Sequence, residues 1–267
     1  MTPDLLRAPH DWVGAPLFVH SFVLPHDRGA LSSARLEVTA EGLVEATLDG
    51  RPVSPDVLVP GWTSYEWRLR MVDYDVTALL GAPGQTHELA LLAGTGWYCG
   101  RLGWMGAQQV YGREPGVAAR LTLQWTDGST TALVTNSSWR VVRSTTRADD
   151  LYDGQTLDLR ISRGPSEPPR IDPLDQGRVV APIGPPIVRH ETIAPVSLSS
   201  RDDGSVVLDF GQNIVGWLRV SATGPAGHRL VATHAEVLEN GELARRPLRS
   251  ARAEDVFVLS GGADLFE

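Results

Sequence analysis

Short apolar or alternating runs, each bounded by turn residues, recur along most of the chain. The runs are 17–24, 34–40, 43–50, 88–94, 119–125, 130–135, 205–211, 216–224, 228–238 and 254–261. Their length, period and flanking Gly, Pro, Asn or Asp are typical of β-strands. Helical spacing is confined to "YDVTALLG" (74–81), which predicts one short turn closed by Gly81.

Asp-Gly and Asn-Gly pairs between these runs predict where the chain reverses. Such pairs favour the left-handed backbone of a two-residue hairpin turn. They occur in "LDGRPV" (48–53), "WTDGST" (125–130) and "ENGEL" (239–243). Short strands with turn signals roughly every ten residues predict an all-β fold, with two β-sandwich (jelly-roll-like) domains in series.

A proline-rich stretch divides this pattern. Residues 164–186 hold seven prolines and show no alternation. Because proline removes a backbone donor and fixes φ, we expect a stiff connection without regular strand pairing. We therefore predict a first β-sandwich at 1–165, a junction at 166–188 and a second β-sandwich at 189–267, incomplete at its C-terminus.

Composition narrows the classes of partner. The net charge is -8 and all 24 Lys and Arg residues are arginine, which argues against nucleic acid, because phosphates need a basic surface. No apolar run reaches the roughly 18 residues of a membrane span. The opening "MTPDLLRAPHDW" lacks the basic and apolar parts of a signal peptide. We expect a cytoplasmic chain with no nucleic-acid and no membrane partner.

Calcium is the one metal that the sequence leaves open. The single cysteine, Cys99, excludes an internal disulfide and a multi-cysteine metal site, and the seven histidines show no His-x-x-x-His spacing. Asp149, Asp150, Asp153 and Asp158 supply the hard oxygen ligands that calcium prefers. Their spacing matches no regular calcium loop, so an ordinary acidic turn is the other interpretation. No cofactor is expected to be required.

No catalytic constellation can be assembled from the sequence. A Gly-x-Ser-x-Gly elbow is absent, and no Ser/His/Asp set stands out. Glycoside hydrolysis needs two carboxyl groups roughly 5 to 9.5 Å apart in a cleft. Glu236, Glu239 and Glu242 lie close in sequence, but on a predicted strand end and turn. A solvated hairpin explains them more simply.

Tryptophan is the feature that points to binding. The chain has eight, and a flat aromatic face can stack on a sugar ring while polar neighbours bond its hydroxyls. Trp125 and Trp139 stand at strand ends, where core packing explains them. The candidates for carbohydrate binding lie in glycine-rich or irregular segments, chiefly "GTGWYCGRLGW": Trp62, Trp67, Trp97, Tyr98, Arg101 and Trp104. Packing is the alternative for the aromatic residues among them.

Several long segments resemble a known family. "VLVPGWTSYEWRLRMVDYDVTALL", "GTGWYCGRLGW" and "LYDGQTLDLR" are similar, in order and spacing, to the N-terminal domain of bacterial α-L-rhamnosidases. "VVLDFGQNIVGWLRVSATGPAG", "HAEVLENGEL" and "LRSARAEDVFVLSGG" resemble the β-domain that follows in that family. The resemblance covers nearly the whole chain apart from the proline-rich stretch.

The resemblance implies β-sandwich domains placed before an α-helical barrel that carries the catalytic carboxylates. It implies hydrolysis of terminal α-L-rhamnosides with inversion, in which a general acid protonates the leaving oxygen and a base activates water. In this plan the barrel follows Glu267, so the family's catalytic acids map onto no residue here and the chain alone is expected to be inactive. The implied partners are an L-rhamnose-containing glycan or glycoside and the catalytic barrel of the same polypeptide.

The chain departs from the family pattern at four positions. Thr95 replaces a usual asparagine, and Cys99 a usual basic residue. Gln155 replaces a usual glutamate, and Leu157 a usual tyrosine. Because Gln155 carries no charge, a contact that needs an anion there is not expected.

Our leading hypothesis is a pair of non-catalytic accessory β-domains of an α-L-rhamnosidase, which support the barrel, with carbohydrate binding as a further expectation. A free-standing carbohydrate-binding protein and a purely structural scaffold are the alternatives. The genomic reading frame distinguishes the accessory domains from the free-standing protein. Continuation past Glu267 into helical sequence supports the accessory role, and a stop codon there favours the free-standing protein.

Overall fold

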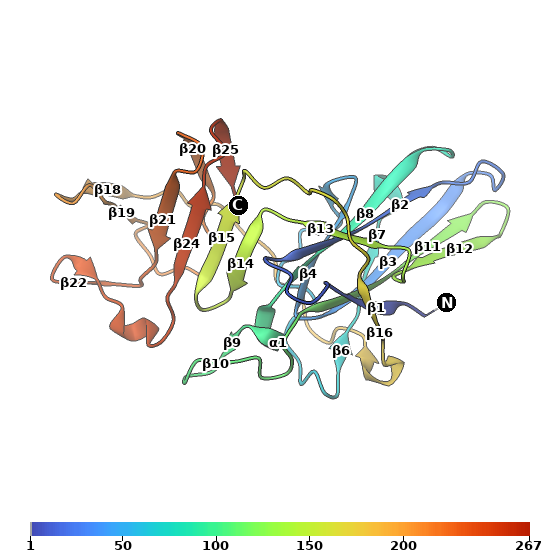
Figure 1. Cartoon of the computed structure of the whole chain (residues 1–267), viewed down its shortest axis with the longest axis horizontal. Coiled ribbons are helices and arrows are strands. Elements are labelled where there is room, and N and C mark those ends of the chain that lie inside the picture. The colour runs from blue at the N-terminus through green and yellow to red at the C-terminus, as the bar shows by residue number, and fades with distance from the viewer. Residues whose placement is uncertain (1) are drawn as a thin grey trace.

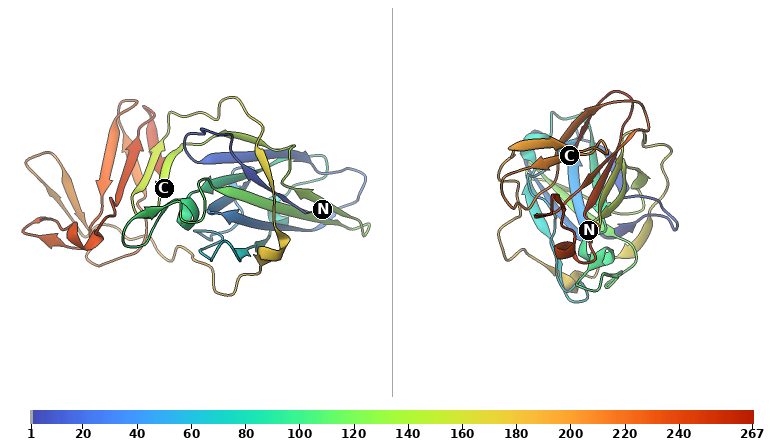
Figure 2. Two further views of the ribbon diagram at one scale, coloured as in Figure 1. Left: turned by 60° about the horizontal axis from the view of Figure 1, so that its bottom comes forward. Right: turned by 90° about the vertical axis from the view of Figure 1, so that its left-hand side faces the viewer.

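The computed structural model describes residues 2–267, which fold almost entirely into β-strands (Figure 1). They form a first β-sandwich and a smaller second unit, which lie end to end along the long axis (Figure 2). The helical elements are α1 (Gly96–Cys99) and the 3-10 turns η1 (Thr77–Leu79), η2 (Gln176–Arg178) and η3 (Arg246–Leu248). Within these described residues, none of the helices could span a bilayer. The all-β prediction is confirmed.

Two antiparallel sheets form the first sandwich. One has the order β16–β1–β11–β3–β7, and β12 also pairs with β11. Its strands are β1 (Asp4–Arg7), β3 (Leu31–Glu41), β7 (Val72–Asp75), β11 (Gly116–Trp125), β12 (Thr130–Val134) and β16 (Arg170–Pro173). The other, of order β13–β2–β8–β4–β5, contains β2 (Pro16–Val23), β4 (Leu43–Leu48), β5 (Arg51–Pro52), β8 (Thr86–Gly94) and β13 (Arg140–Arg143). Strand alternation turns one face of each sheet toward the core.

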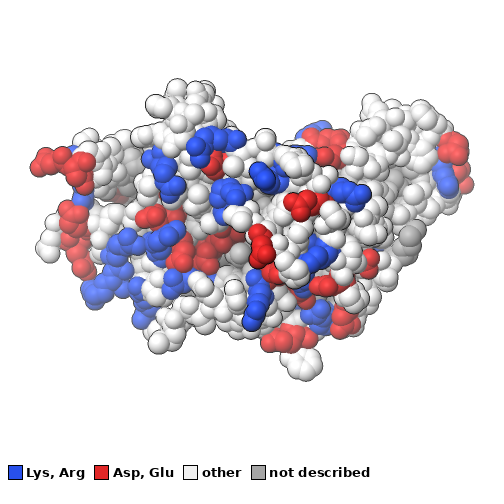
Figure 3. All heavy atoms as spheres, viewed as in Figure 1, with Lys and Arg blue, Asp and Glu red and all other residues white. Residues whose placement is uncertain are grey.

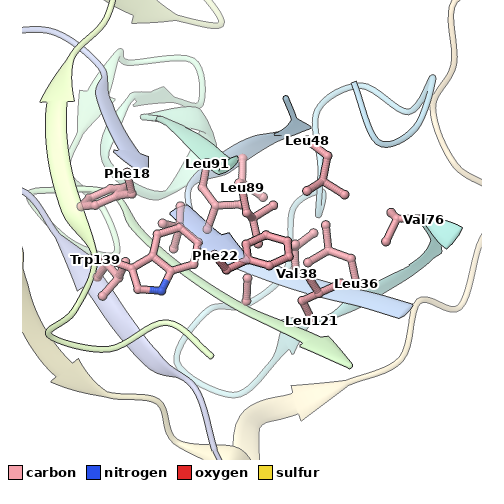
Figure 4. Packing of buried hydrophobic residues seen from close by; sticks show 14 of the residues in the cluster. Phe18, Phe22, Leu36, Val38, Leu48, Val76, Leu89, Leu91, Leu121 and Trp139 are labelled. Carbon is pink, nitrogen blue, oxygen red and sulfur yellow. The ribbon is translucent and has the colours of Figure 1, made fainter. Parts of the chain in front are cut away.

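The core of the first sandwich is filled from both sheets (Figure 4). Phe18 and Leu89 come from one sheet and Leu36 and Leu121 from the other, and none is more than 1% exposed. Trp139 is also 1% exposed, and its indole Nε1 donates to the Val134 carbonyl at 3.1 Å, which satisfies its polar edge. The predicted packing role of this tryptophan is confirmed.

The predicted turns form where the sequence places them. Asp49 and Gly50 have φ of 52° and 74° between β4 and β5. Asn240 and Gly241 have φ of 54° and 81° between β22 (Leu238–Glu239) and β23 (Glu242–Leu243). Paired positive φ values are typical of a type I′ turn, which matches the twist of a hairpin. Residues 74–81 contain a helical turn as expected, but only as η1, because β7 extends to Asp75.

The second unit takes strands from both sides of the proline-rich stretch. Its four-stranded sheet has the order β14–β15–β24–β21, and β15 runs parallel to β24. The strands are β14 (Thr146–Asp150), β15 (Gly154–Asp158), β21 (Arg229–Thr233) and β24 (Glu254–Val258), with the separate pairs β20 (Val220–Thr223) with β25 (Ala263–Phe266) and β18 (Ser197–Ser200) with β19 (Val206–Asp209). Leu157, Phe257, Leu259 and Phe266 form its small core.

Residues 164–190, here called the strap, run along the first sandwich. β16 in this segment pairs with β1 over four residues, and β17 (Val179–Val180) pairs with β6 (Leu69–Arg70). The expectation that the prolines prevent regular pairing is therefore wrong. β16 lies at the edge of its sheet, where a proline such as Pro173 removes no hydrogen bond that a further strand would need.

A buried carboxylate fastens the strap to the sandwich. Glu41, only 3% exposed at the end of β3, contacts the Arg7 guanidinium and that of Arg178 at 3.1 Å. Arg7 also donates from Nε to Asp172 of the strap at 2.6 Å. A buried charge is tolerated only when it is paired and hydrogen-bonded, so this network ties strap and sheet together.

Charged side chains of both signs are interspersed over the face seen in Figure 3. In the described part of the chain, several arginines pair with carboxylates, as Arg35 does with Asp73 at 2.6 Å and Arg163 with Glu88 at 2.8 Å. The face in Figure 3 has no continuous basic stripe of the kind that nucleic-acid phosphates require.

Candidate carbohydrate-binding site

The loop that follows β8 is shaped by its glycines. After Gly94 the chain makes the single turn α1, then the short pair β9 (Arg101–Leu102) and β10 (Ala107–Gln108). Gly96 has a φ of 49°, and a Cβ there would lie 2.7 Å from Leu43 Cγ. A side chain at this position would therefore meet both backbone strain and a clash.

Two of the six candidate residues lie face to face. The rings of Trp62 and Trp97 are stacked with centroids 6.4 Å apart and planes inclined by 15°. Trp62 is 48% exposed, and Trp67, on the same segment before β6, is 76% exposed. Trp62 and Trp67 thus offer aromatic surface to solvent, whereas Trp97 packs partly against the core.

Tyr98 lies in the core. It is 9% exposed, and its ring centroid lies 5.1 Å from that of Tyr65 and 6.5 Å from that of Tyr111. Burial, with the nearby Glu41 carboxylate, raises the pKa of Tyr98 to about 12. In this structure Tyr98 is a packing residue, although its neighbour Trp97 reaches the surface.

Arg101 and Trp104 lie at the joint between the two units. The Arg101 guanidinium donates to Asp153 at 3.0 Å, and Arg252 of the second unit donates its backbone N–H to the same carboxylate at 3.1 Å. The Arg249 guanidinium carbon lies 3.8 Å from the centroid of the Trp104 ring, a cation–π contact. Trp104 is nevertheless 73% exposed.

The four candidate calcium ligands have separate protein partners. Asp149 accepts from the Thr95 backbone N–H at 2.6 Å, and Asp150 from that of Arg101 at 2.7 Å. Asp158 forms a bidentate pair with Arg160, with contacts of 2.9 and 2.8 Å, and Asp153 is held at the joint. Among residues 2–267, no three His, Cys, Asp or Glu side chains are arranged to hold a metal ion. The structure gives the calcium prediction no support.

The four residues that depart from the family pattern are accommodated by local hydrogen bonds and packing. The Thr95 hydroxyl donates to the Asp149 backbone carbonyl at 2.7 Å. Leu157 is buried in the core of the second unit. The Gln155 backbone N–H donates to Asp255 at 3.0 Å. Cys99 is buried, and burial raises the pKa of its thiol to about 12, so it is not an activated nucleophile.

A cavity lies where the first sandwich meets β14, and no pattern in the sequence predicts it. It has a volume of about 290 Å³, and Trp12, Thr95, Arg113 and Asp149 are among its lining residues. Burial raises the pKa of Asp149. The tryptophan count was the only signal that included Trp12, and the residues that meet here are far apart in sequence.

Comparisons with known proteins agree on one family. The sequence model of the alpha-L-rhamnosidase N-terminal domain matches residues 29–190, and that of the bacterial alpha-L-rhamnosidase concanavalin-like domain matches residues 199–266. An alpha-L-rhamnosidase of Streptomyces avermitilis is 35% identical over 261 residues, covering 93% of this chain and 25% of that protein. One from Alteromonas sp. is 30% identical over 84% of this chain and 26% of that protein. The chain thus spans about a quarter of these curated relatives.

Solved structures give the same result for the fold. The native rhamnosidase of Aspergillus terreus superposes with a TM-score of 0.92 and 33% identity, over 100% of this chain and 32% of that one. The Streptomyces avermitilis alpha-L-rhamnosidase complexed with L-rhamnose gives a TM-score of 0.89 and 34% identity, over 96% of this chain and 26% of that one.

Proposed function

Because the chain belongs to the family of α-L-rhamnosidase N-terminal domains, we propose that it forms non-catalytic accessory β-domains of an enzyme that hydrolyses terminal α-L-rhamnosides. In this role the chain supports the catalytic barrel of the same polypeptide and presents aromatic surface to carbohydrate. The observation that carries the supporting role is an uncovered apolar face on the second unit.

The hairpin of β18 and β19 carries this apolar face. Leu198 lies directly opposite Leu208, and Val206 lies two residues before Leu208 on the same side of the hairpin. These side chains are 68%, 43% and 52% exposed, in that order. An isolated two-stranded hairpin is only marginally stable in water, and a contiguous apolar patch marks an interaction surface. Such a face fits a partner that buries it, and we propose that this partner is the barrel.

A chimeric enzyme tests the supporting role. This chain would replace the matching region of the Streptomyces avermitilis enzyme, and hydrolysis of p-nitrophenyl α-L-rhamnoside and the Tm would be measured. We expect an active chimera that loses activity and Tm when Leu198→Asp and Leu208→Asp are introduced together. Val23→Asp is the matched control, because Val23 is 57% exposed on the first sandwich. Equal loss in the control, or none in the double variant, contradicts the proposal.

The carbohydrate role rests on Trp62 and Trp67, whose exposed rings lie on one segment. Titration of the chain with L-rhamnose, followed by tryptophan fluorescence with calcium and again with chelator, tests this role and the calcium prediction together. Saturable change that Trp67→Ala abolishes would support the aromatic surface. A flat response to L-rhamnose in both conditions leaves only the supporting role.

A further inference from the structure

The cavity beside β14 has the form of a small ligand site. Its walls come from the segment between β1 and β2, from the α1 region, from the loop before β11 and from β14. Trp12 forms an aromatic part of the lining, and its indole Nε1 is buried without a hydrogen-bond partner among the described residues. A volume of about 290 Å³ is just below the range of ligand pockets, which hold roughly 300–1,000 Å³.

Polar groups without protein partners surround this cavity. Asp149 uses Oδ2 for its bonds to Thr95, and its Oδ1 accepts no hydrogen bond within residues 2–267. Arg113 is exposed at the rim, and its guanidinium forms no ion pair or hydrogen bond with any described residue. The side chains of Asp11 and Gln109 are likewise without partners in the described part of the chain. The pocket therefore offers donors and acceptors together.

Two lining residues hold a backbone conformation that is rare outside glycine. Asp11 has a φ of 64° and Gln109 a φ of 57°. Positive φ is uncommon for residues with a Cβ, and strained residues of this kind cluster at ligand sites. Both belong to segments that line the same cavity.

The charged groups around the cavity are of both signs. Glu114 at the rim is already paired with Arg170. The remaining groups are one guanidinium, on Arg113, and two carboxyl groups, on Asp11 and Asp149. The two carboxyl groups disfavour a small anion, and the guanidinium weakens their attraction for a cation. Each hydroxyl of a sugar both donates and accepts, so it can use both kinds of group.

From this geometry we propose that the cavity lined by Trp12, Arg113 and Asp149 binds one neutral sugar ring. The inference rests on the carbohydrate-binding part of the proposed function and moves that binding from the exposed tryptophans to a partly open pocket. Trp12 supplies an aromatic surface, while Arg113, Gln109 and Asp149 bond the hydroxyls. The volume suits a monosaccharide unit rather than a longer chain.

Calorimetric titration of the chain with L-rhamnose, D-glucose and sodium acetate tests the proposal. We expect saturable binding of at least one of the two sugars and none of acetate. Arg113→Ala should weaken sugar binding at least about tenfold, and Trp12→Phe should also weaken it. Arg143→Ala is the matched control, because Arg143 is an exposed arginine on β13 that does not line the cavity. Its affinity should match that of the unmodified chain.

Each contrary result has a distinct meaning. Sugar binding that survives Arg113→Ala and Trp12→Phe but is lost in Trp67→Ala overturns the pocket and leaves the exposed aromatic surface as the site. Acetate binding that Arg113→Ala abolishes overturns the choice of a neutral ligand. Absence of sugar binding, with an active chimera, overturns the pocket and leaves the supporting role intact. The Tm of each variant verifies that it is folded, and the exposed Arg113 keeps the test valid if Trp12→Phe does not fold.

Discussion

The two units of this chain contain similar apolar strands but bury them to very different extents. In the first sandwich, 22 residues form one buried hydrophobic cluster, whereas the cluster of the second unit has four. The second unit leaves Leu198, Val206 and Val231 more than half exposed. Apolar periodicity therefore shows that a strand has an apolar face, but it does not show whether that face is covered within the same chain.

Truncation of a large side chain in each unit is the most direct test of this difference. Phe18→Ala removes a ring that is 0% exposed, and we expect it to lower the free energy of unfolding by about 3–5 kcal/mol. Leu198→Ala should change it by less than about 0.5 kcal/mol, because the side chain is already in water. Denaturant unfolding, followed by tryptophan fluorescence, measures both. Similar losses would mean that the second unit is packed in solution against something that covers Leu198.

The second test concerns the network that fastens the strap. Glu41→Gln leaves the guanidinium groups of Arg7 and Arg178 without their shared carboxylate, and we expect a loss of roughly 2–3 kcal/mol, because both arginines are partly solvated. Faster proteolysis within residues 164–190 should accompany it. Glu37→Gln is the control, since Glu37 pairs with Arg120 at a partly exposed site, where a loss of at most about 1 kcal/mol is expected. Equal effects would show that the strap is held by strand pairing alone.

The third test uses the pH dependence of stability. Burial raises the pKa of Asp149 in the folded state, so folding favours its protonated form. Its contribution is full below the unfolded pKa, near 3.9, and is lost as the pH rises through the folded pKa. Asp149→Asn removes this loss and keeps an acceptor for Thr95. As the pH rises from 4 to 8, the free energy of unfolding of the variant should increase relative to that of the unmodified chain. A constant difference would mean that Asp149 is ionised without penalty.

The smallest expected effect concerns the rate at which a buried thiol in the first sandwich reacts. Cys99 is the single cysteine, and burial raises its pKa to about 12. Reaction with a thiol reagent at pH 8 should therefore be slow in the native protein and fast in guanidinium. Rapid native reaction would show that the loop around α1 opens readily, and would make the first sandwich less rigid than its core implies.

Much of the fold follows from local sequence. Asn240-Gly241 and Asp49-Gly50 fix hairpin turns, because their backbone conformation is chosen within two residues. The sequence predicts no strands at the hairpin of β14 and β15, because its aspartates mask the strand pattern. The pairing that stabilises it, between Leu157 and Phe257, joins residues far apart in the chain.

The site was less accessible to sequence reasoning than the fold. Trp97 and Tyr98 are adjacent, yet one stacks on Trp62 and the other enters the core, since neighbouring positions in a tight turn point in different directions. The cavity unites Trp12, Arg113 and Asp149, which belong to three separate segments. No local pattern marks such a group, so only the folded chain shows it.

The parallel pairing of β15 with β24 determines whether the two units can be produced as separate fragments. A parallel pair requires a long crossover, and here the crossover contains the strap and most of the second unit. If the chain were divided in the strap into two separate fragments, β14 and β15 would be lost from the sheet that contains β21 and β24. The buried Val256 and Val258 would then lie on an unpaired sheet edge. We therefore expect the two units, although distinct bodies, to fold correctly only when they are expressed together.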